Sequence, residues 1–279
     1  MKTRGPEGLL ASFVTVAVLS LPALLTSRAA DAIVVRHDRD AQAFIALARK
    51  FPCTVTFRAA ADRGAVSGMG TLVDARWVLT AAHVADALVP GDIVQVGGGD
   101  HEVGQVVRHP QWQGLHRWED VQKDVAMVRL RAPVTGVTPA RIYTGDDESG
   151  LTATFVGRGC YGTGLTGPVA YDATLRAATN RVEKADGPLL EFRFDRPGQP
   201  DVTPLEGISG DGDSGGPAYI ERDGLVYVIG VSSSQDDRPA NKKPGHYGVL
   251  EYYPRVSHFA EWIRATIEPS AMKQAGPEK

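Results

Sequence analysis

The sequence predicts an all-β protein, either a sandwich or a pair of barrels. Short segments with the composition of strands recur along most of the 279 residues, and Gly, Pro and Asp separate them. Amphipathic helices do not alternate with these segments, which argues against a βαβ enzyme. With 43% hydrophobic and 23% charged residues, the chain has the composition of a globular protein able to bury one large core or two small ones.

The elements can be assigned in order along the chain. We predict strands over residues 54–57, 67–74, 77–80, 93–96, 125–130, 152–157, 189–194, 217–220, 225–232 and 248–253. We predict helices over 40–51 and 257–267, and in the second helix Phe259, Ile263 and Ile267 share one face. Residues 269–279 contain few apolar side chains, so we expect them to form a flexible tail.

The N-terminus has the layout of a secretory signal. Lys2 and Arg4 precede a mostly apolar run over 9–25, and small residues follow it. We therefore predict a signal peptide over 1–32, cleaved within 29–32, and a secreted or periplasmic protein without stable membrane association after cleavage. The alternative is a retained membrane anchor, because the apolar run is long for a signal peptide.

Charge and cysteine content limit the partners of the chain. The formal charge of −3 and a pI near 6.2 provide no positive field for nucleic acid, so we expect no nucleic-acid partner. Cys53 and Cys160 either form one disulfide in an oxidising compartment or stay as separate buried thiols. No Cys/His cluster has the spacing of a zinc site, and we expect neither a metal nor an organic cofactor. The acidic runs 146–148 and 236–237 could bind a calcium ion, although such loop carboxylates are usually only solvated.

The stretch GDGDSGGP over 210–217 is either an ordinary turn or the loop of a nucleophile. Its glycines permit a tight backbone that directs N–H groups at a reacting atom beside Ser214. A serine nucleophile needs a base and a carboxylate that orients the base. The candidate base is His83, which follows an apolar strand in RWVLTAAHV. The candidate carboxylate is Asp124, which begins the apolar strand in VQKDVAMVRL. Each of them taken alone would more often be structural.

Together, LTAAH, DVAMVRL and GDSGGP resemble the motifs of the chymotrypsin/trypsin-type serine proteases, in the same order. The similarity extends over about 51–267, and the chain looks like a bacterial secreted member of this family. The resemblance implies two packed six-stranded antiparallel barrels and a C-terminal helix. An N-terminal segment and the first barrel would occupy 33–150, and the second barrel with the helix 151–268.

The resemblance also implies roles for individual residues. Ser214 would attack the scissile carbonyl, His83 would act as the base and Asp124 would orient the imidazole ring. The N–H groups of Gly212 and Ser214 would form the oxyanion hole. Ile208 would form the base of the substrate pocket, and Ser232, Ser233 and Gly248 would line its walls. Asp213 would bind a free amino terminus at Ile33 and so take part in activation. Cys53 and Cys160 would form a disulfide.

These features predict a secreted serine endopeptidase that cleaves protein or peptide substrates through an acyl-enzyme intermediate. An isoleucine at position 208 favours small or apolar substrate side chains over basic ones. Two alternatives stay open, a catalytically silent binding protein with the same fold and an esterase with the same triad. The natural substrate and the oligomeric state are not predicted.

Overall fold

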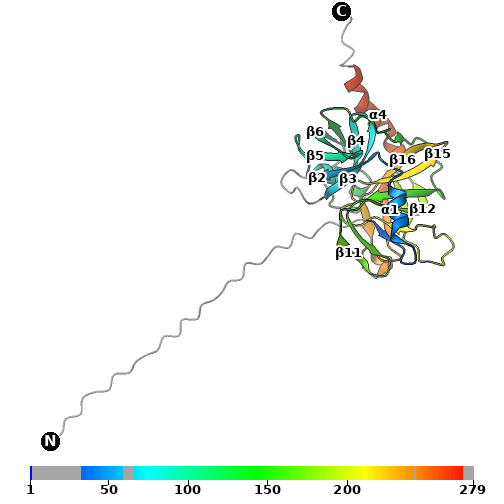
Figure 1. Cartoon of the computed structure of the whole chain (residues 1–279). Coiled ribbons are helices and arrows are strands. Elements are labelled where there is room, and N and C mark those ends of the chain that lie inside the picture. Colours follow the sequence, from blue (N-terminus) through cyan, green and yellow to red (C-terminus); the bar gives the residue numbers. More distant parts are fainter. Residues whose placement is uncertain (2–32, 59–65, 242, 273–279) are drawn as a thin grey trace, which may run out of the picture.

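The computed structural model describes residues 33–58, 66–241 and 243–272, together with Met1. The predicted signal peptide lies almost entirely outside these residues. The described chain forms two β lobes, with α4 (Val256–Met272) extending from one end (Figure 1). Each of the ten predicted strands and both predicted helices correspond to an element of the structure, with small shifts at their ends. Within the described ranges, no helix combines the length and apolarity needed to span a membrane.

The first lobe is a closed barrel. Its strands are β2 (Thr54–Arg58), β3 (Val66–Asp74), β4 (Trp77–Thr80), β5 (Ile93–Val96), β6 (Gly99–Arg108) and β7 (Ala126–Leu130). They are hydrogen-bonded antiparallel in the order β2-β3-β4-β7-β6-β5, and β5 returns to β2. Closure leaves no exposed sheet edge, and it buries Phe57, Leu72 and Met127 completely. Two short helices, α2 (Ala82–Ala85) and α3 (Trp118–Val121), lie in the connections that follow β4 and β6.

The second lobe is built on an eight-stranded sheet. Its strands, in spatial order, are β17 (Ser234–Asp236), β18 (Leu250–Pro254), β13 (Leu189–Arg193), β12 (Arg176–Asp186), β9 (Thr152–Gly157), β15 (Pro217–Arg222), β16 (Leu225–Val231) and β8 (Arg141–Ile142). An isolated bridge joins Gly230 to Arg255, so the six strands from β18 to β16 curl back toward one another. The rings of Phe155, Phe192 and Tyr253 pack together inside this curl, with centroids 4.8–5.2 Å apart.

The N-terminal segment packs against the second lobe, although the sequence groups it with the first barrel. β1 (Val34–Val35) lies between β10 (Cys160–Thr163) and β14 (Gly207–Ile208), and β11 (Gly167–Tyr171) completes this small sheet. α1 (Ala41–Ala48) lies beside β12, as Figure 1 shows in blue and green. Ile33 and Phe44 are buried in the core of the second lobe. The order of residues along the chain does not predict that β1 and α1 pack against the second lobe. Burial of apolar side chains is not directional, so Ile33 and Phe44 can enter either core.

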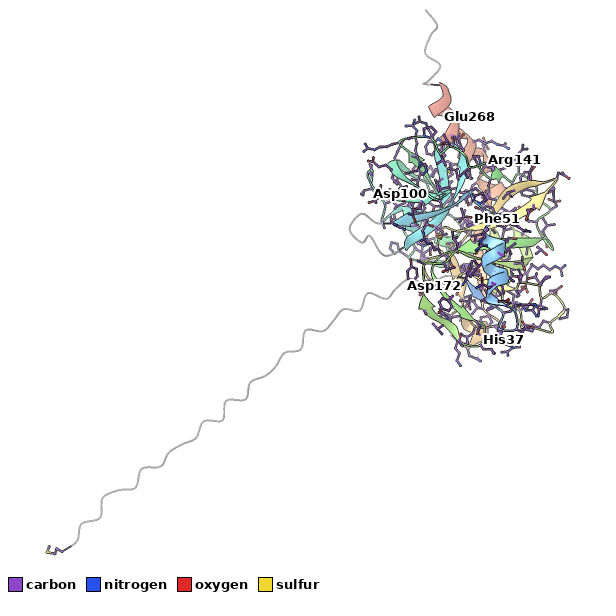
Figure 2. The ribbon with its side chains drawn as sticks, viewed as in Figure 1. His37, Phe51, Asp100, Arg141, Asp172 and Glu268 are labelled. Carbon is purple, nitrogen blue, oxygen red and sulfur yellow. The ribbon has the colours of Figure 1, made fainter. Side chains whose placement is uncertain are left out.

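The C-terminal helix packs against both lobes: it contacts β16 and β8 of the second, and Phe259 and Trp262 contact the His109 ring of the first. Val256, Phe259 and Ile263 belong to a buried cluster that contains side chains from both lobes, such as Leu79 and Val228. The helix continues to Met272, so the first residues of the predicted tail are helical, and residues 273–279 lie outside the described chain. Figure 2 marks Glu268 near the outer end of this helix and His37 at the opposite end of the molecule.

Candidate active site

His83 and Asp124 form a close pair. The Nδ1 atom of His83 lies 2.6 Å from Oδ2 of Asp124, and the backbone N–H of His83 donates to Oδ1 at 2.8 Å. The Asp124 side chain is fully buried, whereas a quarter of the His83 side chain is exposed. One buried carboxylate therefore holds both the ring and the backbone of the histidine, and leaves the ring accessible.

Small side chains make this approach possible. His83 lies on α2, directly after β4, and Asp124 lies between α3 and β7. Ala82 and Ala85 of α2 pack against Ala126 at the start of β7, and all three are completely buried. Methyl groups allow the helix to approach the strand closely, and larger side chains at these positions would move His83 away from the carboxylate.

Ser233 provides a third hydrogen bond to Asp124. Its hydroxyl donates to Oδ2 at 2.5 Å. A buried carboxylate is costly unless donors replace the lost water, and here an imidazole, a backbone N–H and a hydroxyl do so. The sequence predicts Ser233 only as part of a pocket wall, since nothing in the run SSS over 232–234 distinguishes a partner of Asp124.

The segment that carries Ser214 lies against the end of β4. The Ser214 carbonyl accepts a hydrogen bond of 2.8 Å from the backbone N–H of Met69, and Gly215 donates to the Ser232 carbonyl at 2.8 Å. Gly215 has a φ of +78°, and a Cβ there would collide with the Thr80 hydroxyl and lie 3.0 Å from the Ala81 nitrogen. A glycine is required at 215 for this contact. Ser214 is thus held beside the strand end that leads into His83.

The loop before Ser214 has the backbone that its glycines predict. Gly212 has a φ of +92°, a conformation that a side chain makes unfavourable. In the part of the chain that the structure describes, the N–H groups of Gly212 and Ser214 donate to no protein acceptor. Both donors are therefore available to a ligand.

The Asp213 carboxylate holds the loop before Ser214 in place by accepting hydrogen bonds from backbone N–H groups. One carboxylate oxygen accepts from the N–H groups of Arg158 at 3.0 Å and Gly159 at 3.3 Å, and the other accepts from Gly210 at 3.0 Å. Ile33 is buried in the second-lobe core, and the neighbouring Val34 pairs with Ile208. The activating role suggested for a free amino terminus at Ile33 stays a prediction.

A pocket of about 320 Å³ opens beside Ser214. It is lined by Ser209, Gly210, Asp211, Ser214, Ser232, Ser233, Ser234, Gln235, Asp237, Pro244 and Glu251. Ile208 and Gly248, expected from the sequence to lie in the base and a wall, are not among these residues. Because β14 pairs with β1, Ile208 packs in an apolar cluster with Val34 and Phe194. Its neighbour Ser209 lies in the pocket instead, as the alternation of side chains along a strand requires.

Glu251 is the buried charged residue of this pocket that the sequence did not reveal. It lies on β18, opposite Gln235, with 1% of its surface exposed. The N–H of Ser209 donates to one carboxylate oxygen at 3.1 Å, and the Ser209 hydroxyl donates to the other. Burial raises the pKa of Glu251 to about 8; the Ser209 N–H opposes this rise, and the negative charge of Asp213 adds to it. The sequence does contain one indication of this role. Val249, Glu251 and Tyr253 alternate along one strand, and Glu251 is the charged residue among these buried positions.

The expected disulfide is not supported. Cys53 is a free, buried thiol whose Sγ donates to the Tyr219 hydroxyl at 3.5 Å. Burial raises the pKa of this thiol. The side chain of Cys160 lies outside the described structure.

The carboxylates considered for calcium contact arginines. Glu148 is completely buried and pairs with Arg255 at 2.6 Å, and Asp147 pairs with Arg222 at 3.2 Å. Among the described residues, no group of three or more His, Cys, Asp or Glu side chains has the arrangement of a metal site. The carboxylates of Asp147 and Glu148 therefore already have cationic partners.

Comparison with known proteins gives the family. A model of the family described as Trypsin matches residues 45–263, and the chain therefore belongs to the trypsin family. At the level of that family it is a serine protease, and so a hydrolase.

Two relatives illustrate the distance within the family. Serine protease SP24D of Anopheles gambiae is 26% identical over 213 residues, which cover 71% of either chain. Testisin of Homo sapiens is 25% identical over 235 residues, which cover 74% of this chain and 72% of testisin. Both relatives come from animals, so they give no support to the expectation of a bacterial-looking member.

Proposed function

We propose that the protein is a serine endopeptidase in which Ser214 is the nucleophile, His83 the general base and Asp124 the orienting carboxylate. The observation that carries this proposal is the double hydrogen bond from His83 to a fully buried Asp124. Since Nδ1 is engaged with the carboxylate, Nε2 is the nitrogen left to exchange a proton with Ser214.

The reaction follows from these roles. His83 takes the hydroxyl proton of Ser214 while the oxygen bonds to the scissile carbonyl carbon, and the carbonyl oxygen becomes an oxyanion. The N–H groups of Gly212 and Ser214 stabilise this charge. His83 then returns the proton to the leaving amine as the C–N bond breaks, which leaves an acyl-enzyme. A water molecule, deprotonated by the same histidine, hydrolyses the ester and restores Ser214.

Electrostatics favour this sequence of steps. The imidazolium that forms during each step is next to the Asp124 carboxylate, in a site where little water screens the attraction. Preorganised oxyanion donors typically contribute about 100- to 1000-fold to the rate each. Secretion after removal of the signal peptide is part of the same proposal, because the apolar N-terminal run precedes the folded lobes.

Two other functions use the same fold. A catalytically silent binding protein would keep the lobes without a reactive Ser214, and an esterase would use the same three residues on an ester. The intact His83–Asp124 pair favours an enzyme over the silent protein, and the comparison with proteases favours peptide over ester substrates.

A fluorophosphonate probe tests the proposal directly, because it reacts with an activated serine whatever the substrate preference. We expect the mature protein to be labelled at Ser214, located by peptide mass spectrometry, and the Ser214→Ala and His83→Ala variants to resist labelling. Ser149→Ala is the matched control, because Ser149 is exposed and lies far along the chain from both residues. Folded wild-type protein that takes no label would exclude the enzyme, and labelling without peptide cleavage would favour the esterase.

A further inference from the structure

We propose that a cavity between the two lobes is an effector site for a small amphiphilic anion, a molecule that joins one sulfonate or carboxylate group to an apolar body. The anionic group binds the guanidinium of Arg158, and the bound molecule raises turnover at Ser214. Among the described residues, this cavity and the pocket beside Ser214 have no lining residue in common. The effect on turnover rests on the proposed function of Ser214, whereas binding of the anion does not.

The cavity lies where the lobes meet. Its volume of about 440 Å³ is within the range typical of small-molecule sites, about 300–1,000 Å³. Its walls come from β2 and the chain before it, from the turn between β5 and β6, and from the segments on either side of the β10–β11 hairpin. Phe51, labelled in Figure 2, lines the cavity and stacks on Tyr219 of β15 with ring centroids 5.0 Å apart. A molecule bound here would therefore contact both lobes.

The charged residues that line the cavity are cations. Arg49 and Arg158 line it, and no aspartate or glutamate does so in the part of the chain that the structure describes. The guanidinium groups of Arg58 and Arg158 both donate to Oε1 of Gln95, at 2.7 and 2.9 Å. The Gln95 amide nitrogen donates to Asp100 at 2.8 Å, which fixes the oxygen toward the arginines. Two cations that share one neutral acceptor create a positive potential, and an anion would offset it.

Arg158 keeps a donor for such an anion. Its Nε donates to the Ala173 carbonyl at 2.7 Å and its Nη1 to Gln95, whereas its Nη2 has no acceptor among the described residues. Ala173 also lines the cavity, and its φ of +57° is unfavourable for a residue with a Cβ. Backbone strain of this kind is common where a ligand is held. The arginine is thus fixed through one nitrogen and available through another.

Other parts of the wall suit an apolar body. Phe51, Pro52, Val96 and Leu175 contribute apolar side chains to the cavity. Leu175 is 36% exposed, so a ligand that covers it removes apolar surface from water. A molecule with an anionic end and an apolar end therefore matches both the arginines and these side chains, which a simple inorganic anion does not.

Arg158 also connects the cavity to the loop that carries Ser214. Its backbone N–H donates to Oδ1 of Asp213 at 3.0 Å, and the same carboxylate accepts from the N–H of Gly210 in that loop. An anion that holds Arg158 therefore also holds the support of the proposed oxyanion donors. Binding shifts the loop toward the conformation in which both donors point at the oxyanion, and turnover increases.

Two fluorescent compounds that differ by one sulfonate test binding. Anilinonaphthalenesulfonate carries the anionic group, and phenylnaphthylamine has the same rings without it. We expect the folded protein to bind the sulfonate about tenfold or more tightly than the neutral compound, with an affinity that falls as salt rises. Arg158→Gln should weaken sulfonate binding by about tenfold and leave binding of the neutral compound unchanged. Arg264→Gln is the matched control, because Arg264 is exposed on α4 and does not line the cavity.

Leu175→Asp is a second variant, which keeps the test decisive if Arg158→Gln disturbs the fold. An aspartate here repels the sulfonate, and Leu175 is already partly exposed, so no core contact is removed. Leu165→Asp adds the same charge at an exposed position between β10 and β11, outside the cavity, and should bind the sulfonate as the wild type does. Circular dichroism establishes that each variant is folded.

Turnover tests the effector role. On a peptide that the wild-type protein cleaves, we expect saturating sulfonate to raise kcat by about fivefold, and Leu175→Asp to lose this response. Equal binding of the two compounds, or sulfonate binding that both cavity variants leave unchanged, would overturn the site. Binding at the cavity with an unchanged kcat would overturn the effector role. If Ser214 takes no fluorophosphonate label, the effector role fails with the proposed function, and the titrations still decide whether the cavity binds the anion.

Discussion

The hydroxyl of Ser233 and the Nδ1 of His83 meet on a single carboxylate oxygen, Oδ2 of Asp124. Ser233 comes from the second lobe and the other two residues from the first, so the Asp124 carboxylate is held from both sides of the lobe boundary. Any relative movement of the lobes would lengthen this contact, and the position of the histidine is therefore tied to the packing of the whole molecule.

Replacing Asp124 by Asn should remove most activity without unfolding the protein. An amide has nearly the same size as the carboxylate, but it neither stabilises an imidazolium nor fixes the required tautomer. We expect kcat to fall by about 10,000-fold, measured on a peptide that the wild-type protein cleaves. Asp74→Asn, at the end of β3 in the first lobe, is the control. A loss of less than roughly tenfold would argue against the role of Asp124.

Replacing Ser233 by Ala should have a moderate effect on both activity and stability. The change removes one of three donors to a buried carboxylate, which typically costs about 1–3 kcal/mol of unfolding free energy. We expect a fall in kcat/KM of about tenfold together with a lower Tm, because the same bond also positions Asp124. Ser234→Ala removes a neighbouring hydroxyl that has no bond to Asp124. Equal effects in the two variants would show that the hydroxyl of Ser233 has no special role.

Replacing Gly212 by Ala should reduce turnover more than it reduces stability. With a φ of +92°, Gly212 occupies a region that disfavours a Cβ, and relaxation of the loop would turn its N–H away from the oxyanion. We expect kcat to fall by about 100- to 1000-fold. Gly198→Ala is a matched control, because Gly198 has a φ of +93° and a Cβ there would meet nothing within 4 Å. Comparable loss of activity in the control would assign the effect to general strain.

Stability should fall as the pH rises through the neutral range. The pKa of Glu251 is raised from its usual 4.5 to about 8, so the native state binds more protons than the unfolded state between these values. The free energy of unfolding therefore decreases with pH across this window, by an amount on the order of a few kcal/mol, and Glu251→Gln should flatten the profile.

Glu206 is the comparison for this pH profile. Burial raises its pKa to about 7, and it accepts hydrogen bonds from Thr203 and Asp195 outside the pocket. Glu206→Gln should flatten only the part of the decline below about pH 7. Thermal unfolding measured from about pH 5 to 9 distinguishes the two groups. A wild-type Tm that rises with pH across this range would contradict the raised pKa values.

The elements that the sequence predicted are those whose apolar residues form continuous or alternating runs. The strand over 77–80 is one example, with all four side chains buried. β6 and β12 were missed, although they are the longest strands. β6 contains GDHE and β12 contains NRVEK, and these polar residues interrupt the apolar runs by which a strand is predicted. Both strands are specified by partners on each side of the sheet, which no local window contains.

The residues of the candidate site also fall into two groups, those that a local motif predicts and those that only strand pairing brings together. His83, Asp124 and Ser214 could be proposed from the sequence because each lies in a short motif with its own composition. Glu251 and Ser209 were missed because they meet only when β14 and β18 fold together, 42 residues apart in sequence. Ile208 was misplaced because counting back from Ser214 gives a position along the chain, whereas the pairing of β14 with β1 decides which side chain enters the pocket.

Both ends of the described chain are needed to complete the buried cores. The cluster shared by the two lobes includes Val256, Phe259 and Ile263 from the last helix, and the core of the second lobe includes Ile33 and Phe44 from the beginning of the described chain. The shared cluster is complete only when the last helix has been synthesised and has packed. A nascent chain that still lacks this helix therefore has an unfinished core, so the relative positions of His83 and Ser214 in the proposed site would be fixed only late in synthesis.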